Sequence, residues 1–475
     1  MRNSIHTFVR LCGIAVAFLA ALPVSADYNR MGIPDSSEIR RDINERWLSA
    51  PLSYIRGARP EIQVDSAGTA FQIRLEENDA EFAIVVAPQV VTELSVQENS
   101  FARSQMSVDY PAGAPGGWIL YRSKETGKAT KVRYYFCADS DVYIQFYPSG
   151  NRTLGDMVIF GFYAARGVPV GLPFSSFYTA SFEDVSRWTA RTLPWEKTDI
   201  EPGLYANSTR LIAVIRSYLP HIRHVADSAY DENGNPVYVS TGKPRKELVD
   251  RDIFGNELPS DPQQVTVNGF GFLKWIADGL VRPLSGSGIK IAALTEPTNS
   301  YNPTGLQGNL ERSYSLAAAL DWTRNLAAQI LSARTGRDYS NRNTGTDVTV
   351  NPFSAEIKDG RLINSAGYLQ ETGYQVDSLK AMLYVLAVTE PDTFYFGAIK
   401  ERGAIAKEGA GTAADVLVFD RCAAFFPYFD SNARFRCAVF MDGRELSFEQ
   451  FVSTFSGSFV HLSRIKSSDM FYPYK

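Results

Sequence analysis

Residues 267–281, VNGFGFLKWIADGLV, join a close-set Gly/Phe turn directly to an amphipathic helical pattern. Asn268 is suited to cap this helix, because its side-chain oxygen can accept a hydrogen bond from a backbone N–H of the first turn. The apolar face at helical spacing consists of Phe272, Trp275, Ile276 and Leu280. We therefore expect this helix to be the pivot of the second half of the chain.

Residues 268–275, NGFGFLKW, resemble the start of the catalytic helix in the NlpC-type papain-like amidases, envelope enzymes that cut peptidoglycan stem peptides. That family has Asp or Asn, then Cys, a small residue, Gly and Phe. The chemistry needs a thiolate at a helix N-terminus, where the helix dipole lowers the pKa of the thiol. Gly269 stands at the cysteine position, so the resemblance implies a papain-like relative without covalent catalysis there.

The family also places a histidine downstream as a base, and no histidine occurs here between His224 and His461. His461 lies in the strand-like run FVHLSRI, where it is either a displaced base or a packed core histidine. If the resemblance fails, residues 267–281 form only a helix packed in the core. If it holds, the candidate binding groove is edged by Gly269, Gly271, Trp275, Asp278 and His461.

The first residues have the pattern of an export signal. Arg2 and Arg10 flank a positive segment, a short apolar run covers residues 11–22, and residues 24–26 are a small-residue cleavage site. The apolar run is shorter than the roughly 20 residues that a membrane-spanning helix needs. We therefore expect residues 1–26 to be removed, no transmembrane segment in the mature chain, and a periplasmic or extracellular protein.

Composition bounds the remaining possibilities. With 475 residues, 45% of them hydrophobic, the chain can form two or three domains, each with its own core. The formal net charge is -4 and no basic stripe occurs, which argues against nucleic acid as a partner. The sequence does not set the oligomeric state.

Three cysteines remain after cleavage, Cys137, Cys422 and Cys437, too few for a disulfide-dense scaffold. Cys422 and Cys437 lie on two strand-like runs on either side of residues 430–432. A disulfide between them and a pair of buried apolar thiols are both open.

Residues 27–60 contain a helical pattern from Asp35, which can cap it, to the stop at Pro51. Six runs between residues 61 and 185 then alternate apolar and polar side chains with a period of two, separated by turn sequences. This pattern predicts an antiparallel β-sandwich or barrel. Its many aromatic side chains form either its core or a face that binds sugar or peptide.

Residues 186–475 have helical patterns at 204–219, 310–334 and 377–388, with Asp377 as the expected cap of the last helix. A hairpin signal at 233–234 and several strand-like runs after residue 393 complete this part. Helices followed by antiparallel strands predict an α+β domain, papain-like if the resemblance holds.

No cofactor or metal site is expected. His221, His224 and Asp227 have a spacing that could begin a metal site, but a pair three residues apart is common by chance. Asp250 and Asp252 lack the oxygen spacing of a calcium loop.

The first functional hypothesis is therefore an exported, non-catalytic envelope protein that binds a cell-wall polymer or an envelope protein. No intact nucleophile and base are found, so no catalytic residue is assigned. One alternative is a cell-wall hydrolase with an atypical site around His461, assembled with Asp278 and Cys422. Another is a structural subunit of an envelope complex.

Overall fold

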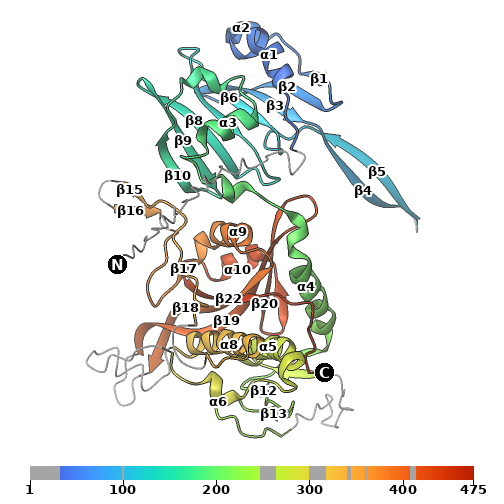
Figure 1. Cartoon of the computed structure of the whole chain (residues 1–475), viewed down its shortest axis with the longest axis vertical. Helices are drawn as coiled ribbons and strands as arrows, with labels where there is room; N and C mark the ends of the chain where they lie inside the picture. Colours follow the sequence, from blue (N-terminus) through green and yellow to red (C-terminus); the bar gives the residue numbers. More distant parts are fainter. Residues whose placement is uncertain are drawn as a thin grey trace, which may run out of the picture.

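The computed structural model describes residues 33–98, 101–246, 264–298, 317–339, 344–358, 361–364, 366–406 and 413–474. The predicted signal peptide, residues 1–26, lies outside them. Figure 1 shows an elongated molecule in which two parts are stacked along the long axis, each built around an antiparallel sheet. We call them the N-terminal part, described from residue 33 to residue 199, and the C-terminal part, described from residue 200 to residue 474.

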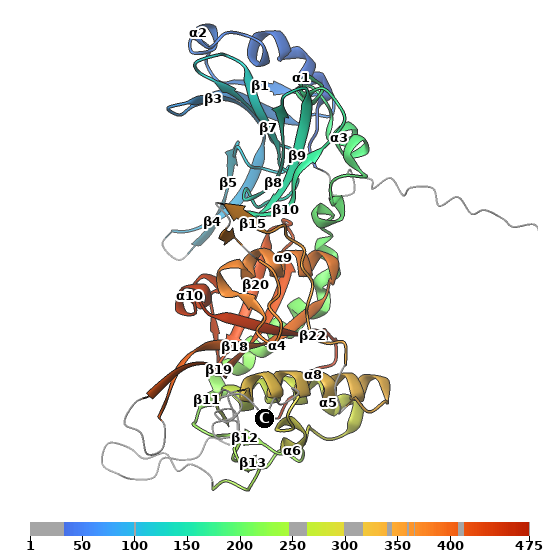
Figure 2. The same cartoon turned by 90° about the vertical axis from the view of Figure 1, so that its left-hand side faces the viewer.

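The N-terminal part contains an eight-stranded sheet in the order β1-β2-β3-β6-β7-β8-β9-β10, with all neighbours antiparallel. The strands are β1 (Glu61–Val64), β2 (Ala70–Glu77), β3 (Glu81–Pro88), β6 (Trp118–Ser123), β7 (Ala129–Tyr134), β8 (Val142–Ser149), β9 (Arg152–Ile159) and β10 (Phe162–Pro169). Each of the six predicted runs overlaps one of these strands, and the last of them, residues 157–164, covers the end of β9, the turn after it and the start of β10. A separate two-stranded ribbon, β4 (Val90–Glu98) and β5 (Phe101–Asp109), projects from the sheet (Figure 2).

The structure differs here from the expected sandwich or barrel. Helical segments, not a second sheet, cover the apolar face: α1 (Ser37–Asp42), η2 (Asn44–Leu48), α2 (Leu52–Ile55), η3 (Phe174–Phe177), α3 (Phe182–Thr189) and η4 (Trp195–Thr198). Trp47, in the lead-in segment, and Trp195, beyond residue 185, belong to the same core as the strands. Alternation reveals that one face of a sheet is buried, but not which element buries it.

The C-terminal part contains a six-stranded antiparallel sheet in the order β17-β22-β18-β19-β20-β21. Its strands are β17 (Tyr374–Gln375), β18 (Thr393–Ala406), β19 (Ala413–Phe429), β20 (Phe435–Met441), β21 (Arg444–Leu446) and β22 (Phe459–Lys466). The main helices are α4 (Ala206–Tyr218), α5 (Gly269–Ser285), α8 (Ala318–Thr335), α9 (Leu379–Thr389) and α10 (Phe448–Thr454). The predicted helices and the order of helices before strands are confirmed, except that residues 310–316 of the helix predicted at 310–334 lie outside the described residues.

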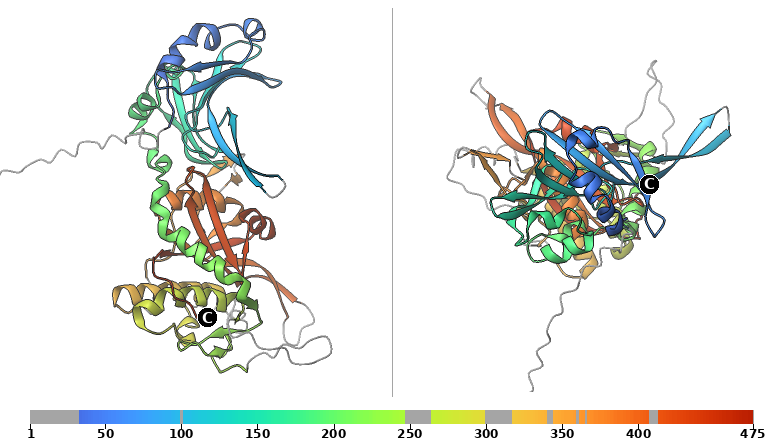
Figure 3. Two further views of the ribbon diagram at one scale, coloured as in Figure 1. Left: turned by 90° about the vertical axis from the view of Figure 1, so that its right-hand side faces the viewer. Right: turned by 90° about the horizontal axis from the view of Figure 1, so that it is seen from above.

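Short elements complete this part. The helical turns are η5 (Pro202–Tyr205), η6 (Leu219–His221), α6 (Ile291–Leu294) and η7 (Val376–Ser378). The two-residue to four-residue strands are β11 (Ile222–His224), β12 (Ala229–Tyr230), β13 (Pro236–Val237), β14 (Val265–Val267), β15 (Glu356–Lys358) and β16 (Arg361–Asn364). The predicted hairpin is the β12–β13 pair. α4 runs along the C-terminal part from its junction with the N-terminal part (Figure 3).

Both faces of the six-stranded sheet are buried. Phe394 and Phe396 of β18 face a core shared with α4, α5 and α8, while Tyr395 and Ile399 face a core shared with α9 and α10. The second core also continues into the N-terminal part, where it includes Val142. An apolar core therefore joins the two parts of the molecule.

Two predicted helix caps are wrong in detail. Ser36, not Asp35, caps α1, and Ser378 precedes α9, while the Asp377 carboxylate accepts hydrogen bonds from residues 456 and 457. Asp35 instead forms a 2.6 Å ion pair with Arg40 and accepts the Phe182 N–H at 2.9 Å. The carboxylate thus ties α1 to α3, because a carboxylate can accept from a cation and a backbone N–H at once.

Arg40 is only 1% exposed and joins the same two helices. Its guanidinium donates to the carbonyl of Ala180 and lies within 4.8 to 5.6 Å of three ring centroids, those of Trp118, Tyr134 and Phe182. A buried guanidinium over aromatic faces gains cation–π attraction in addition to its hydrogen bonds.

Arg40→Ala should therefore lower the free energy of unfolding by about 3 kcal/mol, because the change removes one member of a buried charge pair. Arg41→Ala, at the exposed neighbouring position, is the matched control and should change it by less than about 0.5 kcal/mol. Urea unfolding followed by tryptophan fluorescence measures both. Equal effects of the two substitutions would contradict a role for Arg40 in fastening α1.

Candidate functional site

Helix α5 begins as its sequence predicts. The Asn268 side chain accepts a hydrogen bond from the Gly271 N–H at 2.8 Å, and the helix ends at Gly286, whose φ of 77° is left-handed. Every residue from 271 to 281 is buried. A helix that is buried all round is a core helix.

Other residues of the protein occupy the space beside Gly269 and Gly271, where the first half of the groove was expected. A Cβ on Gly269 would lie 2.5 Å from the Asp442 carboxylate, and a Cβ on Gly271 would lie 2.1 Å from the Ser228 carbonyl. These glycines therefore permit close packing of the protein against itself. The expectation that they leave room for a ligand is wrong.

The second half of the expected groove is filled by residues 471–474. Trp275 and Asp278 are each 1% exposed, and the Trp275 indole N–H donates to the carbonyl of Tyr474 at 2.8 Å. The Phe471 ring packs edge-on against Trp275, with 5.7 Å between ring centroids. Neither Trp275 nor Asp278 is accessible to a polymer.

Asp278 belongs to a buried ion pair that the sequence reasoning missed. Lys274 Nζ lies 2.6 Å from Asp278 Oδ2, both side chains are 1% exposed, and Asp278 Oδ1 accepts the Ile289 N–H at 2.7 Å. Burial raises the pKa of Asp278 to about 6 and lowers the pKa of Lys274, although each partner opposes the shift of the other. Opposite charges four residues apart on an apolar helix were the available signal.

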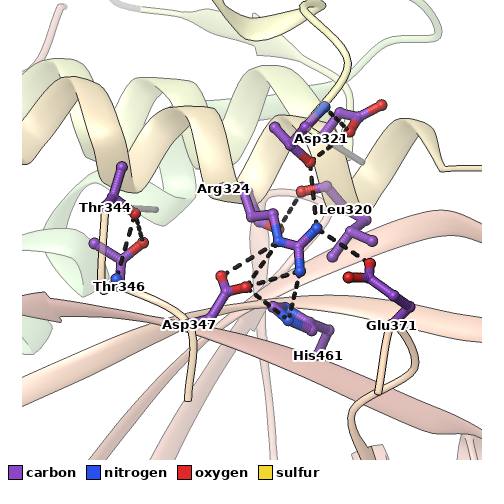
Figure 4. Close-up of polar contacts among 10 residues, drawn as sticks. Leu320, Asp321, Arg324, Thr344, Thr346, Asp347, Glu371 and His461 are labelled. Atoms are coloured by element: carbon purple, nitrogen blue, oxygen red, sulfur yellow. Dashed lines mark hydrogen bonds and ion pairs between the residues drawn. The ribbon is translucent and has the colours of Figure 1, made fainter. Parts of the chain in front are cut away.

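His461 lies in a second polar cluster (Figure 4). It projects from β22, is 0% exposed, and its Nε2 is 3.4 Å from Asp347 Oδ2 and 3.3 Å from Arg324 Nη2. Arg324 reaches down from α8 and donates to both oxygens of Asp347, at 2.7 Å for the closest contact. Arg324 Nη1 also lies 3.4 Å from the exposed carboxylate of Glu371.

The ion pair and hydrogen bonds of this cluster join α8, β22 and residues 344–348. Burial alone would raise the pKa of Asp347, but hydrogen bonding and attraction from His461 and Arg324 lower it overall. His461 Nδ1 is buried and has no hydrogen-bond partner among the described residues. Arg324 and Asp347 were missed from the sequence, because both lie more than a hundred residues from His461.

The structure does not bring His461, Asp278 and Cys422 together. Ala398 of β18 lies opposite Cys422 of β19 on one side and opposite His461 of β22 on the other. The backbones of His461 and Cys422 are therefore two strand spacings apart, about 9 to 10 Å. Asp278 makes its contacts with Lys274 and residue 289 instead. Burial raises the pKa of the Cys422 thiol well above its ordinary value, which disfavours a nucleophilic thiolate.

Cys422 and Cys437 do not form the disulfide considered from the sequence. Both thiols are free, and Cys437 lies opposite Pro427, five residues along β19 from Cys422. Cys422 belongs to the core on the α5 side of the sheet, whereas Cys437 packs against the core on the other side. The sheet separates them, so both are buried or half-buried thiols.

The metal ligands considered from the sequence are not assembled either. His224 lies in strand β11, and the Asp227 carboxylate accepts hydrogen bonds from the backbone and hydroxyl of Ser240. In the part of the chain that the structure describes, no three His, Cys, Asp or Glu side chains are grouped as metal ligands would be. Asp250 and Asp252 lie outside that part.

An open groove of about 1320 Å³ lies where the two parts of the molecule meet. From the N-terminal part it is lined by residues 33 and 34, by residues 88–92 at the start of the β4–β5 ribbon, by residues 111 and 113–115, and by residues 136, 138 and 140. From the C-terminal part it is lined by residues 200–204, 431–434 and 436. We call it the junction groove; no sequence pattern predicts it, because its six segments are far apart in the chain.

Residues 29–197 match a domain family of unknown function (DUF8515). Comparison with curated proteins gave no match, and comparison with solved structures gave none. The matched residues extend from the start of α1 to η4, so they include the ribbon and one wall of the junction groove. Among the described helices, none combines the length and hydrophobicity needed to cross a bilayer.

Lys274→Met should lower the free energy of unfolding by about 3 to 5 kcal/mol, because it leaves the Asp278 carboxylate buried without its cation. The double substitution Lys274→Met/Asp278→Asn should recover most of that loss, since asparagine can still accept the residue 289 N–H. Chemical unfolding of the wild type, the single variant and the double variant measures the coupling between the charges of Lys274 and Asp278. An equal loss in the single and double variants would show that the pair contributes no charge coupling.

Asp347→Asn should destabilise the protein most at neutral pH. The folded-state pKa of Asp347 is lowered, so its stabilising contribution is fully present above the unfolded pKa of about 3.9 and is lost as the pH falls through the folded value. The difference between wild type and variant should therefore shrink below about pH 4.

Glu371→Gln is the control in the same cluster, because the Glu371 side chain is 53% exposed and should contribute little at any pH. Urea unfolding between pH 7 and pH 3 compares the two substitutions. A destabilisation by Asp347→Asn that stayed constant over this range would contradict the charge-based account.

Proposed function

We propose that this protein is an exported, non-catalytic protein of the cell envelope that binds a cell-wall polymer or a protein partner. The junction groove carries this proposal, because it is open and takes its walls from both parts of the molecule. Its volume of about 1320 Å³ exceeds the roughly 300 to 1,000 Å³ of typical small-molecule sites. Export rests on the signal-peptide pattern of residues 1–26.

Two features of the groove support binding of a larger partner. Val91 and Leu204 are 49% and 47% exposed in its lining, although large apolar side chains are usually covered. The core that continues between the two parts also holds the walls in a fixed relation, so a partner would meet a preformed site.

The papain-like relation is part of the proposal for the C-terminal part. The capped N-terminus of α5 packs close to an antiparallel sheet, and Gly269 occupies the position of the family's cysteine. The Asp442 carboxylate lies beside that glycine, where a side chain on residue 269 would begin. These features support the proposal that the C-terminal part is a papain-like module that has kept the packing of the helix on the sheet and lost the nucleophile.

The two alternatives have narrower support. His461 and Asp347 resemble a base and the group that orients it, which favours a hydrolase, but His461 is 0% exposed and no thiol or hydroxyl of the described residues is hydrogen-bonded to it. The projecting β4–β5 ribbon, paired with no other strand in the described chain, favours a structural subunit. A groove with accessible side chains supports the binding role more directly.

The test uses the exported protein in its host with a photo-crosslinking amino acid at Leu204 or, as control, at Leu284. Leu284 is similarly exposed, at 42%, but lies at the end of α5. Light-dependent adducts are expected from position 204 and not from 284, and digestion by a muramidase or a protease identifies the adduct as polymer or protein. Purified protein should release no soluble fragments from cell-wall sacculi. The absence of adducts from 204 would overturn the binding role, and released fragments would overturn its non-catalytic character.

A further inference from the structure

We propose that the junction groove binds an extended polypeptide, which adds as a strand to the free edge of β4 and places an acidic side chain near Arg434. This inference rests on the proposed binding function and names the class of partner.

The backbone of β4 forms part of the groove wall. β4 pairs with β5 over nine residue pairs without a register shift, and within the described chain no strand pairs with its other edge. Residues 88 to 92 line the groove, and the last three of them, 90 to 92, are the first residues of β4. Side chains alternate between the two faces of a strand, so a groove over one face would be lined by every second residue. The three consecutive residues of β4 indicate that the groove follows the strand edge there.

A free strand edge recognises another polypeptide through its backbone. Its unpaired N–H and C=O groups match those of an added strand, which is how many domains capture extended peptides. A two-stranded ribbon is also marginally stable in water by itself, and a third strand would extend its hydrogen-bonding ladder. The groove leaves space beside β4 for such a strand.

The lining of the groove argues against a sugar chain. Sugar rings are commonly held on exposed aromatic faces, but the aromatic residue among the lining side chains is Phe136, which is 2% exposed. Five prolines instead form rigid apolar sections of the described lining: Pro34, Pro88, Pro111, Pro115 and Pro202. These surfaces suit the side chains of a peptide.

One arginine in the groove wall favours an acidic side chain on the peptide. The charged residues of the lining are Glu201, Arg434 and Arg436. Arg436 is paired with Asp430 at 3.0 Å, whereas Arg434 is exposed and, among the described residues, has no carboxylate within ion-pair distance. A guanidinium in this state can bind a carboxylate of the partner through charge-assisted hydrogen bonds.

The experiment selects binders to residues 27–475 from a displayed library of random decapeptides. Selected peptides should be rich in β-branched residues, contain Asp or Glu, and lack proline at central positions. Hydrogen exchange of the protein should slow at backbone amides within residues 90–92, the β4 residues of the groove wall, when such a peptide is bound. Methylation of alternate peptide amides on the pairing edge should abolish binding, while methylation on the other edge should not.

Arg434→Glu should weaken binding of the acidic peptides about tenfold or more, since a hydrogen bond to a charged group contributes about 1.5 to 3 kcal/mol. It should also favour peptides in which Lys replaces the acidic residue. Arg444→Glu is the matched control, because Arg444 is an exposed arginine on β21 outside the groove lining.

Three outcomes would overturn the inference. Selection of no peptides, or binding without slowed exchange at residues 90–92, would exclude strand addition. Equal effects of Arg434→Glu and Arg444→Glu would exclude the acidic contact. If Leu204 crosslinks to a muramidase-sensitive polymer while no peptide binds, the inference fails and the proposed binding function stands. If position 204 gives no adduct at all, the proposed function fails as well.

Discussion

Burial of both faces of the six-stranded sheet is the constraint on which the C-terminal part depends. Successive residues of β18 enter different cores, Phe394 and Phe396 on one side and Tyr395 and Ile399 on the other. Such a strand must be apolar at nearly every position, and the sheet needs a helical layer on each face. The chain supplies α5 and α8 for one layer and α9 and α10 for the other. Charged groups inside this part therefore need partners, as Lys274 and Asp278 provide for each other, whereas the buried His461 Nδ1 has none among the described residues.

The elements of this part were predictable because their signals are local. Asn268 caps α5, Gly336 ends α8 in a left-handed conformation, and Ser447 and Gln450 form a capping box at α10. The cover of the N-terminal sheet was not predictable in the same way. Its alternating strands show a buried face, but the helices that bury it come from segments more than a hundred residues apart.

The candidate site was predicted less well than the fold. Glycines near the start of a helix suit close approach, but the same pattern serves a substrate or a neighbouring backbone, and Gly271 meets the Ser228 carbonyl. The buried partners of His461 and Asp278 illustrate a second limit. Lys274 was visible as an adjacent opposite charge, whereas Arg324 and Asp347 reach His461 only through the packing of α8 on the sheet.

The same two-sided burial leaves the junction of the two parts as the place where we propose that a partner binds. The sheet faces are already covered, so an added partner cannot reach them without displacing a helix. The strand edges and connecting loops carry backbone groups that the cores do not use, and several of these segments meet in the junction groove. Because Val142 and Tyr384 belong to one continuous core, the walls of that groove keep their spacing before a partner arrives. A preformed site loses less conformational entropy on binding, which allows a modest contact area to hold an extended chain.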